Sequence, residues 1–166
     1  MTKEALAAQT YLAYGSWASS QGYSGVANFL FRHADEERNH MMKILEYILD
    51  RGAEVCVIAI PAPPKNPSSI NNCIEKVFES EVANTKAIYK LVKISFEEDD
   101  WATWNFMQTF VLEQLEEETL ALNLLDKIKI AGGEKATNDG LYLFDKDLEK
   151  ITGDAVLAKD VTAEKP

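Results

Sequence analysis

A glutamate and a histidine interrupt an otherwise apolar helix face in the pattern Glu37-x-x-His40. The residues of this face recur at alternating intervals of four and three, the spacing of a helix that packs into a bundle; they are Leu30, Ala34, Glu37, Met41, Ile44 and Ile48. A carboxylate buried alone is costly unless it is paired or binds a metal ion. Glu37 is therefore either a defect in this face or, with His40, part of a ligand set.

Three further predicted helices carry an acidic residue on their apolar face. Glu4 lies on the first of the four helices, Glu81 on the third, and Glu113 and Glu117 on the fourth. A single glutamate on a helix usually belongs to a solvated face, but the same placement on four helices favours a common purpose. Two divalent cations would neutralise the charges of Glu4, Glu37, Glu81 and Glu117. Oxygen ligands with one imidazole suit iron or manganese better than copper or structural zinc.

The helices that position these residues are predicted at 1–21, 24–50, 68–96 and about 100–131, followed by a short amphipathic helix at 141–151. A proline-rich segment at 54–69 separates the second helix from the third, and a connection of this length can cross a whole bundle. We predict an all-α four-helix bundle with a long crossover between helices two and three and a short fifth C-terminal helix. The predicted domain covers 1–152, and 153–166 is predicted to be a flexible C-terminal tail.

The composition limits the partners of the chain. Its 166 residues carry a net charge of -10, which disfavours nucleic acid and anionic membranes and attracts cations. No apolar run is long enough to span a membrane, and the first residues lack a signal-peptide pattern, so we expect a cytoplasmic protein. Cys56 and Cys73 are expected to be reduced thiols in a loop and at a helix start, with a metal or disulfide role as the alternative.

Over residues 1–152 the chain resembles the non-haem ferritins of bacteria, a ferritin-like family of di-iron four-helix bundles. The segments that carry the resemblance are Glu4 with Tyr11, the run Ala34-Asp35-Glu36-Glu37-Arg38-Asn39-His40, Glu81, Glu113-Gln114-Leu115-Glu116-Glu117, and Gly140-Leu141-Tyr142-Leu143-Phe144-Asp145. Together these motifs are specific, although Glu-x-x-His alone is not.

The resemblance implies a role for each matching residue. Glu4, Glu37 and His40 would hold a first iron, and Glu37 would bridge to a second iron held also by Glu81 and Glu117. Gln114 would line the second iron and help to position oxygen. Tyr11 would lie beside the pair as a redox or hydrogen-bonding residue; the alternative is a core aromatic whose hydroxyl bonds to a carboxylate.

The family also has a third, nearby iron position. Glu36, Glu113 and Glu116 match its ligands, with Glu117 shared between the centres. The alternative is that these residues are solvated acids on the inner surface of a cage.

Two differences separate the chain from related families. Haem-binding bacterioferritins have a second Glu-x-x-His where this chain has Gln114-x-x-Glu117, and a haem-ligating methionine where it has Arg38, so no haem is expected. Rubrerythrins add a Cys-x-x-Cys domain that does not occur in this sequence. His33 is expected to be structural or at the surface, with metal transit as the alternative.

Met1 lies only three residues before Glu4, whereas the first helix of the family begins roughly three turns earlier. Either the given sequence lacks an N-terminal segment, or Glu4 lies at a helix end that frays. The second alternative would weaken the first iron position.

The resemblance implies an iron-storage ferroxidase, in which Fe(II) is oxidised by dioxygen or hydrogen peroxide and ferric mineral is deposited inside a homo-oligomeric cage of 24 subunits. A passive metal-binding cage and a di-iron oxidoreductase, either peroxide-scavenging or acting on an organic substrate, are the alternatives. The acidic run Glu97–Asp100 is expected to cap a helix; alternatively, it draws Fe(II) toward a pore.

Overall fold

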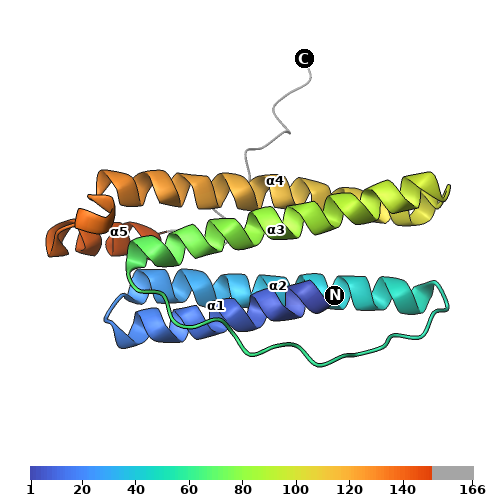
Figure 1. Ribbon diagram of the computed structural model, residues 1–166, viewed down its shortest axis with the longest axis horizontal. Coiled ribbons are helices and arrows are strands. Elements are labelled where there is room, and N and C mark those ends of the chain that lie inside the picture. Colours follow the sequence, from blue (N-terminus) through green and yellow to red (C-terminus); the bar gives the residue numbers. More distant parts are fainter. Residues whose placement is uncertain (151–166) are drawn as a thin grey trace, which may run out of the picture. The chain divides into compact units, whose positions relative to one another are not determined.

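The computed structural model describes residues 1–150, and these residues form α-helices without any β-strand (Figure 1). The all-α prediction is therefore confirmed for this part of the chain. The predicted tail at 153–166 lies outside the described residues and stays a prediction. None of the described helices combines the length and the apolar composition needed to cross a membrane. The described chain divides into two compact units, 1–66 with 138–150 and 67–137.

Helices α1 (Thr2–Ser20) and α2 (Ser24–Asp50) pack side by side in the first unit (Figure 1). The turn between them contains Gly22, whose positive φ of 87° suits a residue without a side chain. Gly15 lets the two helices approach closely, because a β-carbon there would lie 2.7 Å from the ring of Phe31. The predicted helices at 1–21 and 24–50 are thus confirmed to within a residue at each end.

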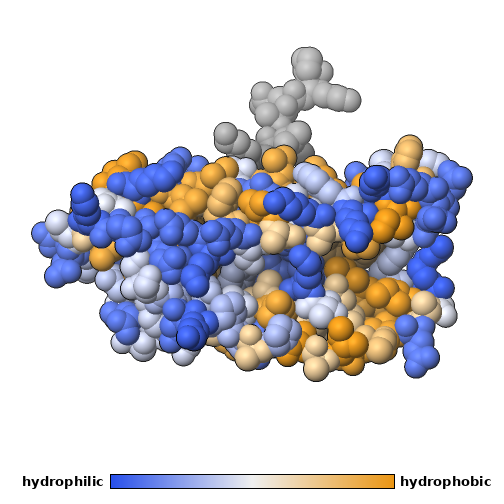
Figure 2. Space-filling view, viewed as in Figure 1, coloured by the Kyte–Doolittle hydropathy of each residue, from blue (hydrophilic) through white to orange (hydrophobic). Residues whose placement is uncertain are grey.

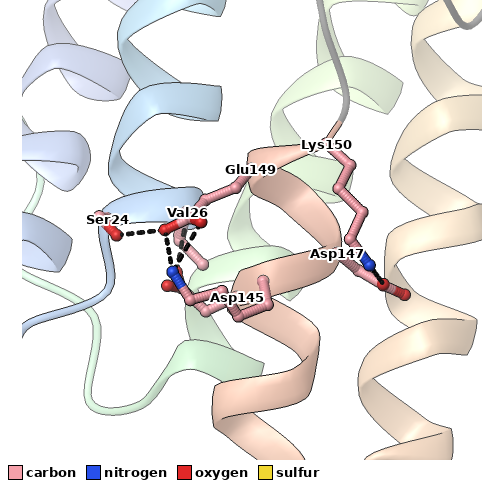
Figure 3. A network of polar contacts seen from close by, with 7 residues as sticks. Ser24, Val26, Asp145, Asp147, Glu149 and Lys150 are labelled. Carbon is pink, nitrogen blue, oxygen red and sulfur yellow. Dashed lines mark hydrogen bonds and ion pairs between the residues drawn. The ribbon is translucent and has the colours of Figure 1, made fainter.

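Helix α5 (Asn138–Glu149) packs against the start of α2 in the same unit (Figure 3). The buried carboxylate of Asp145 accepts a hydrogen bond from the Val26 N–H at 2.9 Å, so a residue of α5 caps α2. The Ser24 hydroxyl donates to Glu149 at 2.7 Å. The amine of Lys146 also donates to Glu149; this hydrogen bond lowers the pKa of the Glu149 carboxyl and raises that of the amine.

A fifth helix was predicted correctly, but it begins at Asn138 and not at residue 141. Asn138 and Asp139 extend it toward the N-terminus of the chain, consistent with the preference of Asn and Asp for the start of a helix. Of the residues predicted on its apolar side, Phe144 and Leu148 are buried and Leu141 is half-buried. Ile151 lies outside the described residues.

Helices α3 (Ile70–Glu97) and α4 (Trp101–Ile130) form the second unit. Ser69 caps α3 by accepting a hydrogen bond from the Asn72 N–H at 3.0 Å. Asp100 caps α4 by accepting hydrogen bonds from the Thr103 N–H at 3.1 Å and its hydroxyl at 2.6 Å. Capping by the acidic run Glu97–Asp100 is therefore confirmed. Gly132, whose φ is positive, separates the end of α4 from the short 3-10 helix η1 (Gly133–Lys135).

Residues 51–69 connect α2 to α3 without helix or strand, as the proline content predicted. Cys56 is exposed in this connection, whereas Cys73 is fully buried in the first turn of α3. Burial raises the pKa of the Cys73 thiol to about 12, although Lys76 lowers it slightly.

The close contact at Gly25 gives a prediction for the docking of α5. A β-carbon at Gly25 would collide with the backbone carbonyl of Asp145. Glycine to alanine in a helix usually stabilises by about 0.5–1 kcal/mol. We expect Gly25→Ala instead to destabilise by about 1–3 kcal/mol, because two backbones must separate. Thermal unfolding measures this change, with Asn28→Ala on an exposed position of α2 as the control; a Gly25→Ala protein as stable as the control would contradict this account.

The burial of Cys73 gives a second prediction, best measured in a Cys56→Ser protein that keeps a single thiol. At about pH 8 the folded protein should resist alkylation, since its thiol stays protonated and inaccessible, and unfolding in urea should restore the reaction. Mass spectrometry counts the modified thiols. Alkylation of Cys73 in the folded state at the rate found in urea would show that this position opens readily.

Candidate metal centre

The first unit brings together Glu4 from α1 and Glu37 and His40 from α2. Both carboxylates are almost completely buried, with exposed fractions of 3% and 4%. Each lies on the apolar face of its helix, as the sequence pattern predicted. Two acidic side chains are therefore held in the interior by the packing of the apolar residues around them. A cation is the simplest partner that would make this arrangement favourable.

The spacing of these three residues suits a metal ion. One potential ligand atom from each of Glu4, Glu37 and His40 lies within 4.8 Å of the other two. The Nδ1 atom of His40 is 3.7 Å from Oε2 of Glu37, which is too long for a hydrogen bond. Ligands about 2.0–2.2 Å from one ion lie up to about 4.4 Å apart, so the separation fits a shared ion.

The electrostatic influence of the two carboxylates extends to Met1. Burial lowers the pKa of the Met1 α-amino group, and the negative charges of Glu4 and Glu37 oppose that shift. Glu4 is in the first turn of α1, where the helix dipole favours an anionic side chain. The described geometry thus keeps Glu4 inside the helix and buried.

The second unit brings together Glu81 from α3 and Gln114 from α4. Both are nearly inaccessible, with exposed fractions of 2% and 4%. The Gln114 amide donates a hydrogen bond from Nε2 to Oε2 of Glu81 at 3.1 Å. Within residues 1–150, the Gln114 Oε1 atom is buried and accepts no hydrogen bond. Glu117 is half-buried one turn further along α4, so it lies on the same side of that helix as Gln114.

The remaining predicted residues differ in exposure. Tyr11 is buried, and its ring meets that of His33 edge-on at a centroid distance of 6.4 Å. Glu36 and Glu113 are half-buried, whereas Glu116 is exposed. The assignment of Glu36, Glu113 and Glu116 to a third iron position stays a prediction.

His33 has a more defined environment than the sequence suggested. Its side chain is only 12% exposed, and its ring lies against Phe29 at a centroid distance of 4.1 Å. Its Nδ1 atom is 3.6 Å from Oε2 of Glu36. The sequence signal that could have drawn attention to it is the symmetry of the segment His33-x-x-Glu36-Glu37-x-x-His40, in which each glutamate has a histidine three residues away.

Comparisons with known proteins show which family the chain resembles. A family profile described as "Ferritin-like domain" matches residues 1–131. A probable bacterial non-heme ferritin-like protein of Haemophilus influenzae is 38% identical over 92% of this chain and 90% of its own length. A bacterial non-heme ferritin of Campylobacter jejuni is 36% identical, covering 91% of this chain and 89% of its own.

A solved structure of similar fold is an open pore ferritin from the archaeon Archaeoglobus fulgidus. It superposes with a TM-score of 0.86 and 34% identity, covering 91% of each chain. Ferritins are four-helix bundles, so the predicted fold, a ferritin-like bundle with a long crossover and a short fifth helix, is confirmed.

The hydrogen bond between Gln114 and Glu81 gives a prediction for the metal-free protein. Gln114→Glu would place a second carboxyl where an amide now donates, and two carboxyls this close cannot both ionise. The pair retains a proton in the folded state, so its raised pKa makes stability fall as pH rises through the neutral range. We expect a loss of about 1–3 kcal/mol at about pH 7.5, decreasing toward pH 5.

Thermal unfolding of chelator-treated protein measures this loss, and an added divalent cation should reduce it. Gln108→Glu is the matched control, because Gln108 is a half-buried glutamine of the same helix whose amide donates to the Trp104 carbonyl. Equal stabilities of the two variants at both pH values would mean that Gln114 does not govern the charge of Glu81.

Proposed function

The chain belongs to the ferritin family, and on that basis we propose that it is a cytoplasmic iron-storage ferroxidase. Iron storage follows from the family. We further propose that the protein oxidises Fe(II) at a defined two-iron centre. The observation that carries it is the burial of acidic residues on the apolar faces of helices in both units, with a histidine in the first and an amide in the second.

We assign the two irons to one centre that takes ligands from all four long helices. Glu4, Glu37 and His40 would hold the first iron, and Glu37 would bridge to a second held by Glu81 and Glu117. Four carboxylates balance the charge of two Fe(II) ions, which removes the cost of burying so many acids. The hard oxygen donors with a single imidazole suit iron.

In this proposal Fe(II) is the substrate. Two Fe(II) ions give up one electron each, which together with two protons reduces one dioxygen to hydrogen peroxide or one hydrogen peroxide to water. Gln114 offers an amide that can donate or accept a hydrogen bond beside the second iron, and Tyr11 offers a buried phenol as a redox or hydrogen-bonding group. Glu36, Glu113 and Glu116 would form the third position, which receives iron next to the centre.

A closed shell would keep the ferric mineral apart from the surrounding solution, and we propose the 24-subunit cage of the family. Large apolar side chains are exposed on the chain, and apolar patches lie between polar ones on the face seen in Figure 2. Val57 and Ile58 in the connection between α2 and α3, and Tyr142 and Leu143 on α5, are among these exposed residues. Contacts between copies would cover such groups.

The centre is tested by removing its ligands one at a time. We expect Glu37→Ala and His40→Ala each to lower the initial rate of Fe(II) oxidation in air at least about tenfold, because loss of a ligand weakens binding of the metal pair. Ferric absorbance and oxygen consumption measure the rate. Glu46→Ala, at an exposed position of the same helix, is the control and should leave it unchanged.

The native mass of each variant should equal that of the parent, so that a slow rate reports the centre and not a broken cage. Oxidation by Glu37→Ala and His40→Ala as fast as in the parent would disprove the proposed centre. A parent rate no higher than the uncatalysed background would instead favour a passive metal-binding cage.

A further inference from the structure

Asn84 continues the apolar face of α3 that carries Glu81, and the proposed centre gives it no role. The face runs through Val77, Glu81, Asn84 and Ile88, spaced four, three and four residues apart. All four residues are buried, and Asn84 is only 8% exposed. Glu81 and Asn84 are thus consecutive polar interruptions of one buried face. An aliphatic residue at position 84 would bury apolar surface without the cost of removing an amide from water.

Helix geometry directs the side chain of Asn84 toward the turn of α3 that carries Glu81. Residues three apart on a helix are neighbours on one face, with their β-carbons about 5–6 Å apart. The Cα–Cβ bonds of a helix also tilt toward its N-terminus, so the side chain of a residue covers the turn before it. The amide of Asn84 and the carboxylate of Glu81 therefore share one side of α3 within the second unit.

The amide oxygen of Asn84 has accepting capacity at this position. Its Oδ1 atom is buried and accepts no hydrogen bond from the residues that the structure describes. The adjacent residue Thr85 is also buried, but its hydroxyl donates to the Glu81 carbonyl at 3.0 Å, so the helix itself satisfies that group. A buried acceptor such as Oδ1 of Asn84 is costly unless a donor or a cation occupies it.

Helix α4 supplies a second amide beside Glu81. Gln114 donates from Nε2 to Oε2 of Glu81 at 3.1 Å, and its Oε1 atom is buried. Glu81 is therefore accompanied by one amide on its own helix and by another on α4. A carboxylate together with uncharged amide oxygens is a set of hard donors that suits a divalent cation, and the set carries a single negative charge.

We propose that Asn84 is a further ligand of the second unit, and that its amide oxygen is an uncharged donor to the divalent cation held by Glu81. An uncharged donor completes the coordination of a cation without adding to the repulsion between buried carboxylates. That this cation is the second iron of a ferroxidase rests on the proposed function. The donor role of Asn84 is tested by metal binding alone.

The test uses the full-length, chelator-treated protein with Mn(II) or Zn(II), each added without oxygen. Calorimetry gives the number of ions per chain and their affinities, and Glu81→Ala identifies the ion that Glu81 holds. We expect Asn84→Leu to weaken Mn(II) binding at that same ion at least about tenfold. Zn(II) binding should weaken less, because Zn(II) usually takes four ligands whereas Mn(II) favours an octahedral set of oxygens.

Two further variants separate the loss of an oxygen donor from a change in packing. Thr85→Val removes a buried hydroxyl at the adjacent position and should leave the Mn(II) affinity unchanged. Asn84→Asp keeps an oxygen donor and adds a negative charge, so it should bind Mn(II) at least as tightly as the parent protein.

Thermal unfolding gives a readout that does not depend on Fe(II) oxidation. Saturating Mn(II) stabilises a folded protein according to its affinity, so it should raise the melting temperature of Asn84→Leu less than that of the parent. The same measurement without metal identifies any variant that fails to fold. If Asn84→Leu does not fold, Asn84→Ala replaces it, because it also removes the oxygen donor.

A parent-like Mn(II) affinity in Asn84→Leu would overturn the proposal. An equal loss of affinity in Thr85→Val or in Asn84→Asp would also overturn it, since a change in packing would then explain the effect. If the parent binds Mn(II) through Asn84 as expected but oxidises Fe(II) no faster than the uncatalysed background, the ferroxidase proposal is rejected and the donor role of Asn84 stands.

Discussion

The need to keep several carboxylates buried constrains the structure of this protein more than any other interaction. Glu4, Glu37 and Glu81 occupy positions where an aliphatic side chain would add stability at no electrostatic cost. Each is fixed there by the apolar residues before and after it on its helix. In the first unit the packing holds Glu4 and Glu37 close to each other, and their mutual repulsion in the absence of a cation opposes folding.

The packing of each unit provides stability independently of any metal. In the first unit, Gly15 allows close contact of α1 with α2, and the buried carboxylate of Asp145 binds α5 to the first turn of α2. In the second unit, Ser69 and Asp100 cap α3 and α4. Each cap is worth about 0.5–2 kcal/mol, which is comparable to the cost of an imperfectly paired buried polar group.

Sequence periodicity predicted the four long helices, because each has a continuous apolar face. The same periodicity singled out the acidic residues, because they interrupt that face. It could not predict the start of α5, where Asn138 and Asp139 are compatible with either a loop or a helix start. It also left His33 undefined, because its environment depends on the approach of Tyr11 from another helix. Spacing along one helix gives the direction of a side chain but not its neighbours. For the same reason, spacing could not predict how buried the acidic residues of the third position are. Glu116 is exposed, whereas Glu36 and Glu113 are half-buried.

Gln114 would let the proposed centre remain folded when it holds no metal. A histidine at this position would add a nitrogen ligand, but a neutral imidazole has a single N–H to donate. The amide of Gln114 donates to Glu81 through Nε2 and still has a buried oxygen with accepting capacity. A storage protein must fill and empty repeatedly, so its ligands need partners in both states. The amide donates to Glu81 without adding a charge, so in the proposed centre it would give this carboxylate a partner when no cation is bound. In the proposed centre, the second unit would therefore need fewer cations to be stable than a purely acidic set would.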